Sequence, residues 1–387
     1  MREIRVGLIG TGIIAHEHAR RYKEIPGVTM VAASDLLEPK LNAFCDQYGI
    51  EHRYLDYRQL LARDDLDAVD VCLHNNLHAP MAIAVMASGK DCYCEKPMAG
   101  AYTDALAMKR ASEQLGKRLH IQLGLLYGAQ MIAAKKLVDA GRLGQIYHAR
   151  SYGYRRRGRP YVDGYGEKEF VSAQWAGHGA LYDMGVYHIS QLLYLLGTPA
   201  VQSVSGKIYQ ELNMPAAQRA ESGYSVEELG TGYVKCAGGL TLDILESWAI
   251  HGDAFPASSL HGTLGGLKLG GRDADGLTYF NEIEGYPAEC AIDIRTQETY
   301  LRRHDPQRKH YDNSQALWVG VLRGECPPID TAHIALQTML VSEGIFLSDQ
   351  LGREVSAEEI AQLSKSIAMT RQETAFGTLT YPPYPFL

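Results

Sequence analysis

Short hydrophobic runs alternate with stretches of helical periodicity through the first 124 residues. Runs that are hydrophobic almost throughout predict strands buried in a parallel sheet, and the stretches between them predict helices that cover it. The predicted strands are residues 4–9, 28–33, 52–54, 68–73, 91–94 and 119–123, and further helices are predicted at 41–48, 57–62, 79–87 and 101–115. This pattern predicts an α/β domain built on a parallel sheet over residues 1–124.

The pattern changes after a helix predicted at residues 128–140. Longer and less uniformly hydrophobic runs predict strands at 146–154, 201–210, 231–237, 240–250 and 288–301, with helices near 179–196 and 331–351. This mixture predicts an α+β domain over residues 125–387, with a large open, mostly antiparallel sheet that has helices on one face. Pairing two such sheets would bury their exposed faces, so we expect a homodimer or homotetramer.

The composition is that of an ordinary globular protein. Hydrophobic residues make up 46% of the 387 residues and charged ones 21%, as in soluble proteins. The net charge of −7 argues against nucleic-acid binding. The seven cysteines are scattered, which fits reduced thiols and no metal site. The chain enters a strand at once and contains no hydrophobic run of membrane length, so we expect a cytoplasmic protein with no membrane partner.

A glycine-rich segment joins the first predicted strand to a following helix. It reads Gly10-Thr11-Gly12-Ile13-Ile14-Ala15. This is the G-x-G-x-x-G/A pattern of Rossmann dinucleotide-binding domains, in its strand–turn–helix context. The glycines allow a tight turn and a close approach of the backbone to a pyrophosphate, and the helix N-terminus favours that charge. We therefore expect this segment to bind the cofactor.

The residue after the second predicted strand favours NAD. Asp35 lies about 20 residues beyond the fingerprint, where an acid binds the ribose hydroxyls of the adenosine. Its carboxylate would repel a 2′-phosphate, and Leu36 and Leu37 offer no arginine to bind one. The positive charge of Lys40 weakens this preference. NADP is therefore kept as the less favoured cofactor. A helix cap is the structural alternative for Asp35.

Polar residues also follow the predicted strand 68–73. They are His74, Asn75, Asn76 and His78. The carboxyl ends of parallel strands are where such sheets bind ligands, so we expect these side chains at the cofactor. For Asn76 or His78 alone, capping the next helix is an equally good interpretation.

The strand 91–94 ends in Glu95-Lys96-Pro97. Proline restricts the backbone of the residue before it, and the Glu95 carboxylate holds the Lys96 ammonium by charge. A lysine beside a positively charged nicotinamide and partly desolvated should have a pKa lowered toward the working range, which suits a general base. Taken alone, the tripeptide fits a surface lysine. The preceding cofactor domain favours a role for Glu95 and Lys96 at the cofactor.

These features together resemble the Gfo/Idh/MocA oxidoreductase family, which includes glucose–fructose oxidoreductase and inositol dehydrogenase. The resemblance covers nearly the whole chain and depends on the order of its motifs. Besides the features above, these include Gly177-His-Gly-Ala-Leu-Tyr-Asp-Met-Gly185 and the late helix 331–351 followed by Gly352-Arg-Glu-Val355. The resemblance implies hydride transfer between nicotinamide and a hydroxyl-bearing carbon, mostly on sugars, inositols and related polyols. It also implies that Lys96 lies in the active site.

The family's second motif is an aspartate followed four residues later by a histidine. Here the segment reads Asp183-Met-Gly-Val-Tyr187-His188. Positions i and i+4 share a helix face, so Tyr187 is presented with Asp183, whereas His188 is turned about 140° away in a regular helix. We predict that Lys96 and Tyr187 bracket the reacting hydroxyl and that Asp183 fixes the lysine and substrate hydroxyls. His188 is a second candidate for the acid–base role, although packing alone explains it better.

Substrate recognition is predicted from aromatic and polar residues near these motifs. Tyr127 follows the sixth strand, and Trp175 precedes the glycine-rich turn, where it can stack on a sugar. His178 stands where many family members have glycine and either contacts substrate or caps the helix. The arginine cluster Arg155–Arg159 either binds an anionic substrate group or forms a solvated or interface loop, and we favour the loop.

Two other functions fit the same resemblance. Some relatives are redox-neutral glycosidases that oxidise a sugar, eliminate its aglycone and reduce it again with the same NAD. A few are non-catalytic NAD-binding regulators. The intact Glu95-Lys96-Pro97 and Asp183 argue against a regulator, because a binding protein has no need of an acid–base pair.

Overall fold

The computed structural model describes residues 1–252, 257–270 and 276–381, and the chain divides into two compact units. The first unit comprises Met1–Gln122, Lys309–Ala332 and Ser366–Leu387, and the second comprises Leu123–Arg308 and His333–Lys365. The first unit is therefore assembled from three separate stretches of chain.

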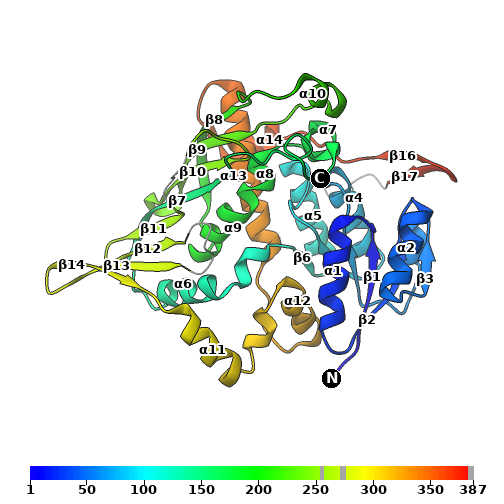
Figure 1. Ribbon diagram of the computed structural model, residues 1–387, viewed down its shortest axis with the longest axis horizontal. Helices are drawn as coiled ribbons and strands as arrows, with labels where there is room; N and C mark the ends of the chain where they lie inside the picture. Colours follow the sequence, from blue (N-terminus) through cyan, green and yellow to red (C-terminus); the bar gives the residue numbers. More distant parts are fainter. Residues whose placement is uncertain (253–256, 271–275, 382–387) are drawn as a thin grey trace. The chain divides into compact units, whose positions relative to one another are not determined.

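The first unit contains the predicted parallel sheet (Figure 1). Its strand order is β3-β2-β1-β4-β5-β6, and every neighbouring pair is parallel. The strands are β1 (Ile4–Ile9), β2 (Val28–Ser34), β3 (His52–Tyr54), β4 (Ala68–Val71), β5 (Asp91–Cys94) and β6 (Leu119–Ile121). This order, with β1 and β4 adjacent at the centre, confirms the predicted doubly wound fold.

Helices cover this sheet and bury its hydrophobic strands. They are α1 (Ile13–Glu24), α2 (Glu38–Tyr48), α3 (Tyr57–Leu61), α4 (Asn75–Ala87), α5 (Tyr102–Leu115) and α12 (Ser314–Arg323). One core cluster joins Leu8 of β1 to Ala15 of α1 and Phe44 of α2. A second joins Ile4 and Val6 of β1 to Trp318 of α12, so a late segment completes the core of the first strands.

Helix α4 begins at Asn75, earlier than the predicted residue 79. Pro80 lies inside the helix, and its missing N–H leaves the carbonyl of Asn76 without its usual partner. The Met369 N–H donates to that carbonyl at 2.9 Å. A hydrogen bond from another segment therefore compensates for the proline.

Met369 belongs to a C-terminal segment that packs along the first unit. The Ile367 N–H donates to Asp104 of α5 at 3.1 Å. The segment continues into the hairpin of β16 (Arg371–Thr374) and β17 (Gly377–Thr380). The ring of Tyr381 then stacks on that of Tyr57, with centroids 5.9 Å apart.

The second unit is built on a nine-stranded sheet with the order β14-β13-β12-β11-β7-β10-β9-β8-β15. Strands β7 and β10 are parallel and the other neighbouring pairs are antiparallel. The strands are β7 (Ile146–Tyr154), β8 (Val201–Tyr209), β9 (Leu229–Cys236), β10 (Thr241–Ser247), β11 (Ser259–Gly262), β12 (Gly266–Leu269), β13 (Leu277–Ile283), β14 (Tyr286–Ala291) and β15 (Val355–Ser356). The predicted open, mostly antiparallel sheet is confirmed.

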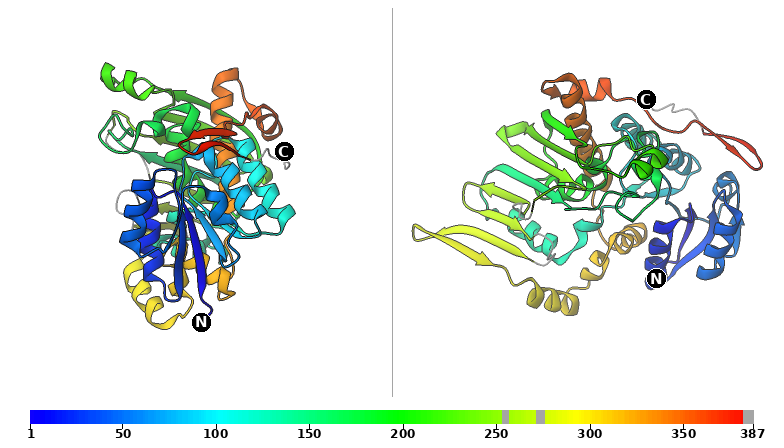
Figure 2. Two further views of the ribbon diagram at one scale, coloured as in Figure 1. Left: turned by 90° about the vertical axis from the view of Figure 1, so that its right-hand side faces the viewer. Right: turned by 45° about the horizontal axis from the view of Figure 1, so that its top comes forward.

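Figures 1 and 2 show helices of the second unit along one face of this sheet. They include α8 (Ala180–Asp183), α9 (Gly185–Leu195) and α13 (Thr331–Leu351), of which α13 starts in the first unit. Ala149 and Ser151 of β7 are buried on the helix side, whereas His148 and Arg150 on the other side are partly exposed. The remaining helices are α6 (Ala129–Asp139), α7 (Ala173–Ala176), α10 (Ala216–Ser222), α11 (Ile294–His304) and α14 (Ala357–Leu363).

Two predicted elements of the second unit are wrong in detail. Residues 288–301 do not form one strand, because β14 ends at Ala291 and Asp293 caps α11 through the Thr296 N–H. The predicted helix 179–196 is broken between Asp183 and Gly185, so α8 and α9 are separate helices.

All seven cysteines are free thiols. Within the described residues, no helix combines the length and hydrophobicity that crossing a membrane requires.

Candidate active site

The glycine-rich turn between β1 and α1 has the geometry that a pyrophosphate requires. Gly10 has φ +91°, and a Cβ there would lie 2.2 Å from the carbonyl oxygen of Cys72. At Gly12, by contrast, a Cβ would meet no described atom within 4 Å. Among the described residues none caps the start of α1 through its side chain, and its first turn contains no acid. The positive end of the helix thus faces open space beside Gly12, which suits an anion.

Asp35 holds this turn from the end of β2. Its Oδ2 accepts hydrogen bonds from the backbone N–H and the hydroxyl of Thr11, both at 2.8 Å, and its Oδ1 accepts the Leu37 N–H at 2.9 Å. Oδ1 has a further lone pair, since it accepts one hydrogen bond and Oδ2 accepts two. The arrangement is therefore compatible with the predicted role of Asp35 at ribose hydroxyls, and it also fixes the loop.

The polar residues after β4 lie at the start of α4 rather than before it. His74 is the N-cap residue, although its side chain makes no cap bond. Asn75 and Asn76 form the first turn, and the Asn76 side chain is buried. His78 is fully buried, with Nδ1 2.7 Å from the Pro97 carbonyl and Nε2 3.0 Å from the Leu73 carbonyl. His78 therefore links α4 to the segment that contains Lys96.

Lys96 follows β5 above a cluster of buried charged groups. The Lys96 N–H donates to Oε2 of Glu95 at 2.7 Å. Oε1 of Glu95 lies 2.8 Å from Nε2 of His18 on α1, and the other ring nitrogen of His18 lies 2.9 Å from Asp70 of β4. The Glu95 side chain thus faces a histidine, while its charge also interacts with the Lys96 ammonium.

In the second unit, a buried carboxylate fixes the turn that carries Asp183. Glu227 accepts the N–H groups of Gly179 and Leu181 at 2.8 and 2.9 Å. Burial raises the pKa of Glu227 to about 7. Asp183 itself, at the end of α8, accepts the indole N–H of the buried Trp248 at 2.8 Å. The two bonds to Glu227 fix the turn, and the Trp248 bond orients the Asp183 carboxylate.

On α9, His188 has a carboxylate partner that the sequence did not reveal. Its Nδ1 lies 2.9 Å from Oε2 of the buried Glu246, whose Oε1 accepts the Ser151 hydroxyl at 2.8 Å. Burial disfavours the imidazolium, but the Glu246 charge outweighs burial and raises the pKa of His188. A Cβ at Gly153 would lie 2.1 Å from Nδ1 of His188, so this glycine allows the pair to form. Tyr187, the residue before it, is partly exposed.

The other predicted substrate residues lie in differing surroundings. His178 packs against the rings of Tyr182 and Phe346, with centroids 4.6 and 4.2 Å away. Burial lowers the pKa of His178 to about 4, so its ring is neutral at pH 7. Tyr127 is buried in the 3₁₀ turn Gly124–Tyr127, and Trp175 on α7 is partly exposed.

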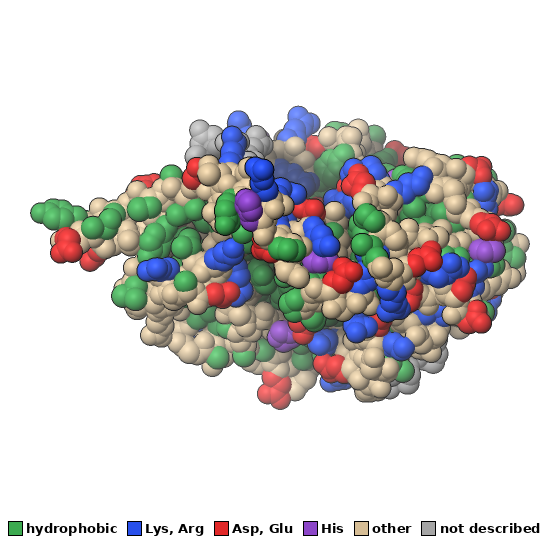
Figure 3. Space-filling view, turned by 90° about the horizontal axis from the view of Figure 1, so that it is seen from below, with side chains coloured by type: hydrophobic (Ala, Val, Ile, Leu, Met, Phe, Trp, Pro, Cys, Tyr) green, Lys and Arg blue, Asp and Glu red, His purple; other side chains and the backbone are tan. Residues whose placement is uncertain are grey.

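The arginine cluster is largely neutralised by local partners. The buried Arg159 pairs with Asp163 at 3.0 Å and with Glu228 at 3.1 Å, and Arg157 pairs with Asp163 at 3.1 Å. The Arg155 guanidinium lies over the ring of Tyr165, 5.4 Å from its centroid. These pairings favour the loop interpretation. Basic and acidic side chains are likewise interspersed over the face in Figure 3.

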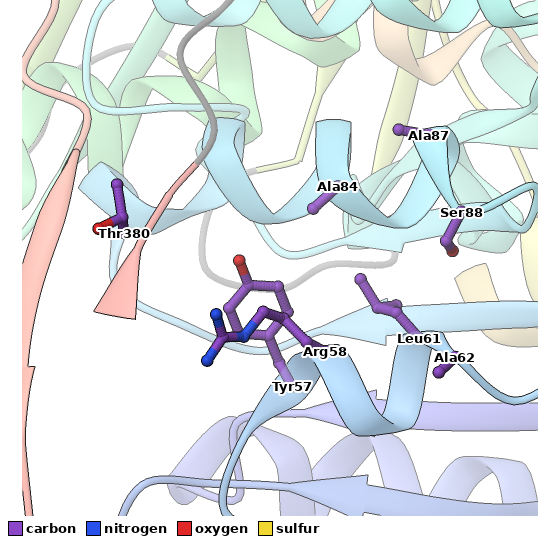
Figure 4. A pocket seen from close by; sticks show the side chains of 8 residues that line it. All are labelled: Tyr57, Arg58, Leu61, Ala62, Ala84, Ala87, Ser88 and Thr380. Carbon is purple, nitrogen blue, oxygen red and sulfur yellow. The ribbon is translucent and has the colours of Figure 1, made fainter. Parts of the chain in front are cut away.

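A separate concavity of about 490 Å³ lies in the first unit, between α3, α4 and Thr380 (Figure 4). Its lining consists of Tyr57, Arg58, Leu61, Ala62, Ala84, Ala87, Ser88 and Thr380. It contains none of the predicted site residues, so we do not assign the active site to it.

The first unit combines a dinucleotide-type turn, an acid after the second strand and the matching strand order. Its fold and residues define a Rossmann-type nucleotide-binding protein with a second α+β domain. Residues 4–123 match the family described as "Oxidoreductase family, NAD-binding Rossmann fold", and residues 131–268 match the "GFO/IDH/MocA C-terminal domain". The chain belongs to the Gfo/Idh/MocA oxidoreductase family.

Relatives and solved structures agree with this assignment. D-glucoside 3-dehydrogenase of Escherichia coli is 29% identical over 254 residues, which are 64% of this chain and 71% of that protein. Inositol 2-dehydrogenase of Salmonella typhimurium is 32% identical over 155 residues, 38% of this chain and 46% of that protein, so the match spans less than half of that relative. An NAD-binding oxidoreductase from Klebsiella pneumoniae has a TM-score of 0.76 at 21% identity over 92% of this chain and 99% of that one, which shows the shared fold.

Proposed function

We propose that this protein is an NAD-dependent oxidoreductase that transfers hydride between nicotinamide and a hydroxyl-bearing carbon of a sugar, glycoside or polyol. The observation that carries the proposal is that one chain matches both domains of the family while retaining Lys96 and Asp183. The relatives described above are named as dehydrogenases of inositol and of glucosides. These names support a dehydrogenase and do not favour the redox-neutral glycosidase.

The residues of the first unit fit NAD. The open space beside Gly12 and the uncapped start of α1 suit the pyrophosphate, and Asp35 suits the ribose hydroxyls. The bound cofactor supplies the hydride acceptor or donor. Asp35 also disfavours a 2′-phosphate, so NADP is the weaker candidate.

The chain's own residues would supply binding and proton transfer. Lys96 takes the hydroxyl proton as the alcohol is oxidised, and Asp183, oriented by Trp248, binds substrate hydroxyls. For the second acid–base group on α9, the Glu246 partner supports His188, because a carboxylate that holds one ring nitrogen fixes how the other is presented. Tyr187 remains the alternative.

The proposal is tested by NADH formation across monosaccharides, glycosides, inositols and sugar acids, with wild type and Lys96→Ala. We expect turnover with at least one polyol, and a fall of about 10²- to 10⁴-fold in kcat for the variant, since it lacks the general base. NAD affinity should stay nearly unchanged in a fluorescence titration.

Lys109→Ala is the matched control, because Lys109 on α5 is an ordinary ion-paired lysine, 3.3 Å from Glu113. It should retain wild-type turnover. Turnover of Lys96→Ala within a few-fold of wild type would contradict the assignment, and release of free sugar from glycosides without net NADH would point to the glycosidase.

We further propose that the protein acts in the cytoplasm as a homodimer or homotetramer. The partly exposed face of the nine-stranded sheet supports association. So does the β13–β14 hairpin, whose tip exposes Ile283 and Tyr286 at 56% and 75%. Hydrophobic side chains are visible at the projecting hairpin in Figure 3.

A further inference from the structure

A closed set of titratable side chains lies beneath Lys96. His18 of α1 and Asp70 of β4 are both 0% exposed, and Glu95 is 5% exposed. Both ring nitrogens of His18 are within hydrogen-bond distance of a carboxylate, 2.9 Å from Asp70 and 2.8 Å from Glu95. A neutral imidazole donates through one nitrogen alone, whereas an imidazolium donates through both. The geometry therefore fits a protonated His18 between two ionised carboxylates.

The charges agree with this protonation state. Burial opposes the imidazolium, but the interactions with Asp70 and then Cys72 outweigh it and hold the pKa of His18 well above its usual range. Burial likewise opposes the Glu95 carboxylate, but His18 and then Lys96 outweigh it and lower the pKa of Glu95. Other titratable neighbours include Cys72, which directly follows β4, Tyr22 of α1, Cys94 of β5, His78 of α4 and Tyr93 of β5, whose ring lies 5.5 Å from that of His18. Burial raises the pKa values of Cys72 and Tyr22, so both are neutral at pH 7.

The Glu95 carboxylate connects the cluster to Lys96, the proposed catalytic lysine. Oε1 of Glu95 binds His18, and Oε2 accepts the Lys96 N–H at 2.7 Å. Rotation of the Glu95 side chain would break both bonds at once. We propose that His18, held by Asp70, is a positioning residue for Lys96, because it locks Glu95 in the ionised state and orientation that fix the lysine backbone.

A metal ion is the competing explanation, because His18, Asp70 and Cys72 place their ligand atoms within 4.8 Å of one another. The Nδ1 of His18 and the Oδ2 of Asp70 lie 2.9 Å apart, which is a hydrogen-bond distance with a proton between the two atoms. The second ring nitrogen of His18 also faces Glu95 rather than a neutral acceptor. These features favour a proton as the cation at the centre of the cluster.

The inference rests on the proposed function and is tested with His18→Gln in the full-length protein. We expect kcat to fall about 10- to 100-fold, the scale of a small misplacement of a catalytic group, with the Kd for NAD within about threefold of wild type. Without the imidazolium, Glu95 should take up a proton at higher pH. Turnover of His18→Gln should then fall with decreasing pH where wild type is constant.

Two further variants separate positioning from folding. The double variant His18→Gln/Glu95→Gln lacks the new titrating group and should lose that pH dependence. His120→Gln is the matched control, since His120 on β6 is a buried histidine that lies 3.0 Å from the Ser314 hydroxyl of α12. It should lower the unfolding temperature as His18→Gln does, yet leave kcat and the pH profile unchanged.

Two measurements need no substrate. The ring nitrogens of His18 should both carry protons at pH 7 in ¹⁵N NMR spectra, and amide exchange in the peptide containing Lys96 should quicken in His18→Gln. A neutral His18, or a stoichiometric bound metal, would overturn the inference. So would a His18→Gln enzyme with wild-type kcat and pH profile, provided that Lys96→Ala is inactive. If wild type turns over no polyol, the proposed function fails, and the NMR and exchange results still decide the state of the cluster.

Discussion

At the scale of single residues, the second unit depends on a buried acid placed against backbone N–H groups. Glu227 is 3% exposed and accepts hydrogen bonds from two backbone N–H groups in the turn before Asp183. Burial raises its pKa from 4.5 to about 7. The folded protein therefore holds a proton here that the unfolded chain releases at lower pH.

This shift predicts a falling stability as pH rises. Because the folded pKa lies above the unfolded value, the contribution is complete below pH 4.5 and is lost as pH rises through about 7. The loss should amount to about 3 kcal/mol, at about 1.4 kcal/mol per pKa unit. Chemical denaturation of wild type and Glu227→Gln at several pH values measures it. Between pH 4.5 and about 7, the free energy of unfolding should fall in wild type and not in the variant. Parallel pH profiles of the two proteins would contradict the prediction.

Single residues also show which signals the sequence contained. On α1, His18 shares a buried face with Ala15, Ala19 and Tyr22, and Asp70 interrupts the otherwise hydrophobic Ala68–Val71. A polar residue at a position of hydrophobic periodicity indicates a partner, although not which one. Glu246 gave the same signal, because it is in step with the buried Leu242 and Ile244 of β10. Its partner His188 is 58 residues away and is brought near when α9 packs against the sheet, so the sequence does not identify the pair.

At the scale of elements, the two glycines of the turn between β1 and α1 differ in their backbone conformation and surroundings. Gly10 is required by the backbone, since its φ is +91° and a Cβ would meet the Cys72 carbonyl. Gly12 has an ordinary φ of −76° and open space where its Cβ would be. We therefore expect the first glycine to be required for the fold and the second for binding the ligand.

Alanine substitutions should separate these duties. Gly10→Ala should destabilise the protein by at least about 1–3 kcal/mol, because strain and a backbone clash coincide. Gly12→Ala should keep wild-type stability but weaken NAD binding about tenfold or more, equivalent to about 1.4 kcal/mol. Thermal unfolding and NAD titration of both variants test the contrast. Equal effects of the two substitutions on stability would refute it.

Elements with strong local signals were predicted well. Strands such as β1 and β5 matched their predicted bounds because their residues are buried on both faces. Residues 288–301 were misjudged because the single predicted strand spans two elements, the end of β14 and most of α11, which Asp293 separates. The start of α4 was placed late because Pro80 is normally a boundary, and the Met369 hydrogen bond that permits it comes from the far end of the chain.

At the scale of the whole molecule, association should use the exposed face of the nine-stranded sheet. Tyr233 of β9 is 45% exposed and pairs in register with Asp243, which in turn pairs with Arg150. All three side chains therefore lie on that face. Tyr147 of β7 is 52% exposed but lies on the opposite side, because neighbouring residues of a strand alternate.

We predict that Tyr233→Glu lowers the mass in solution to that of one chain. When the exposed sheet faces of two copies pair, the introduced carboxylates would bring like charges into the interface. Light scattering coupled to size exclusion measures this. Tyr147→Glu should leave the wild-type mass unchanged. A wild-type mass equal to a single chain would refute association altogether.

The assembly of the first unit from three stretches of chain also affects when its core can form during synthesis. The ribosome completes β1 through β6 by Ile121, but Trp318 of α12, which packs on Ile4 and Val6, is synthesised roughly 10 to 40 seconds later at typical rates of translation. During that interval the hydrophobic side of β1 lacks the part of its cover that α12 provides, although Tyr22 of α1 and Tyr93 of β5 in the same cluster have already been made. The newborn nucleotide-binding domain must therefore wait for nearly the entire second unit to be made before its core can close.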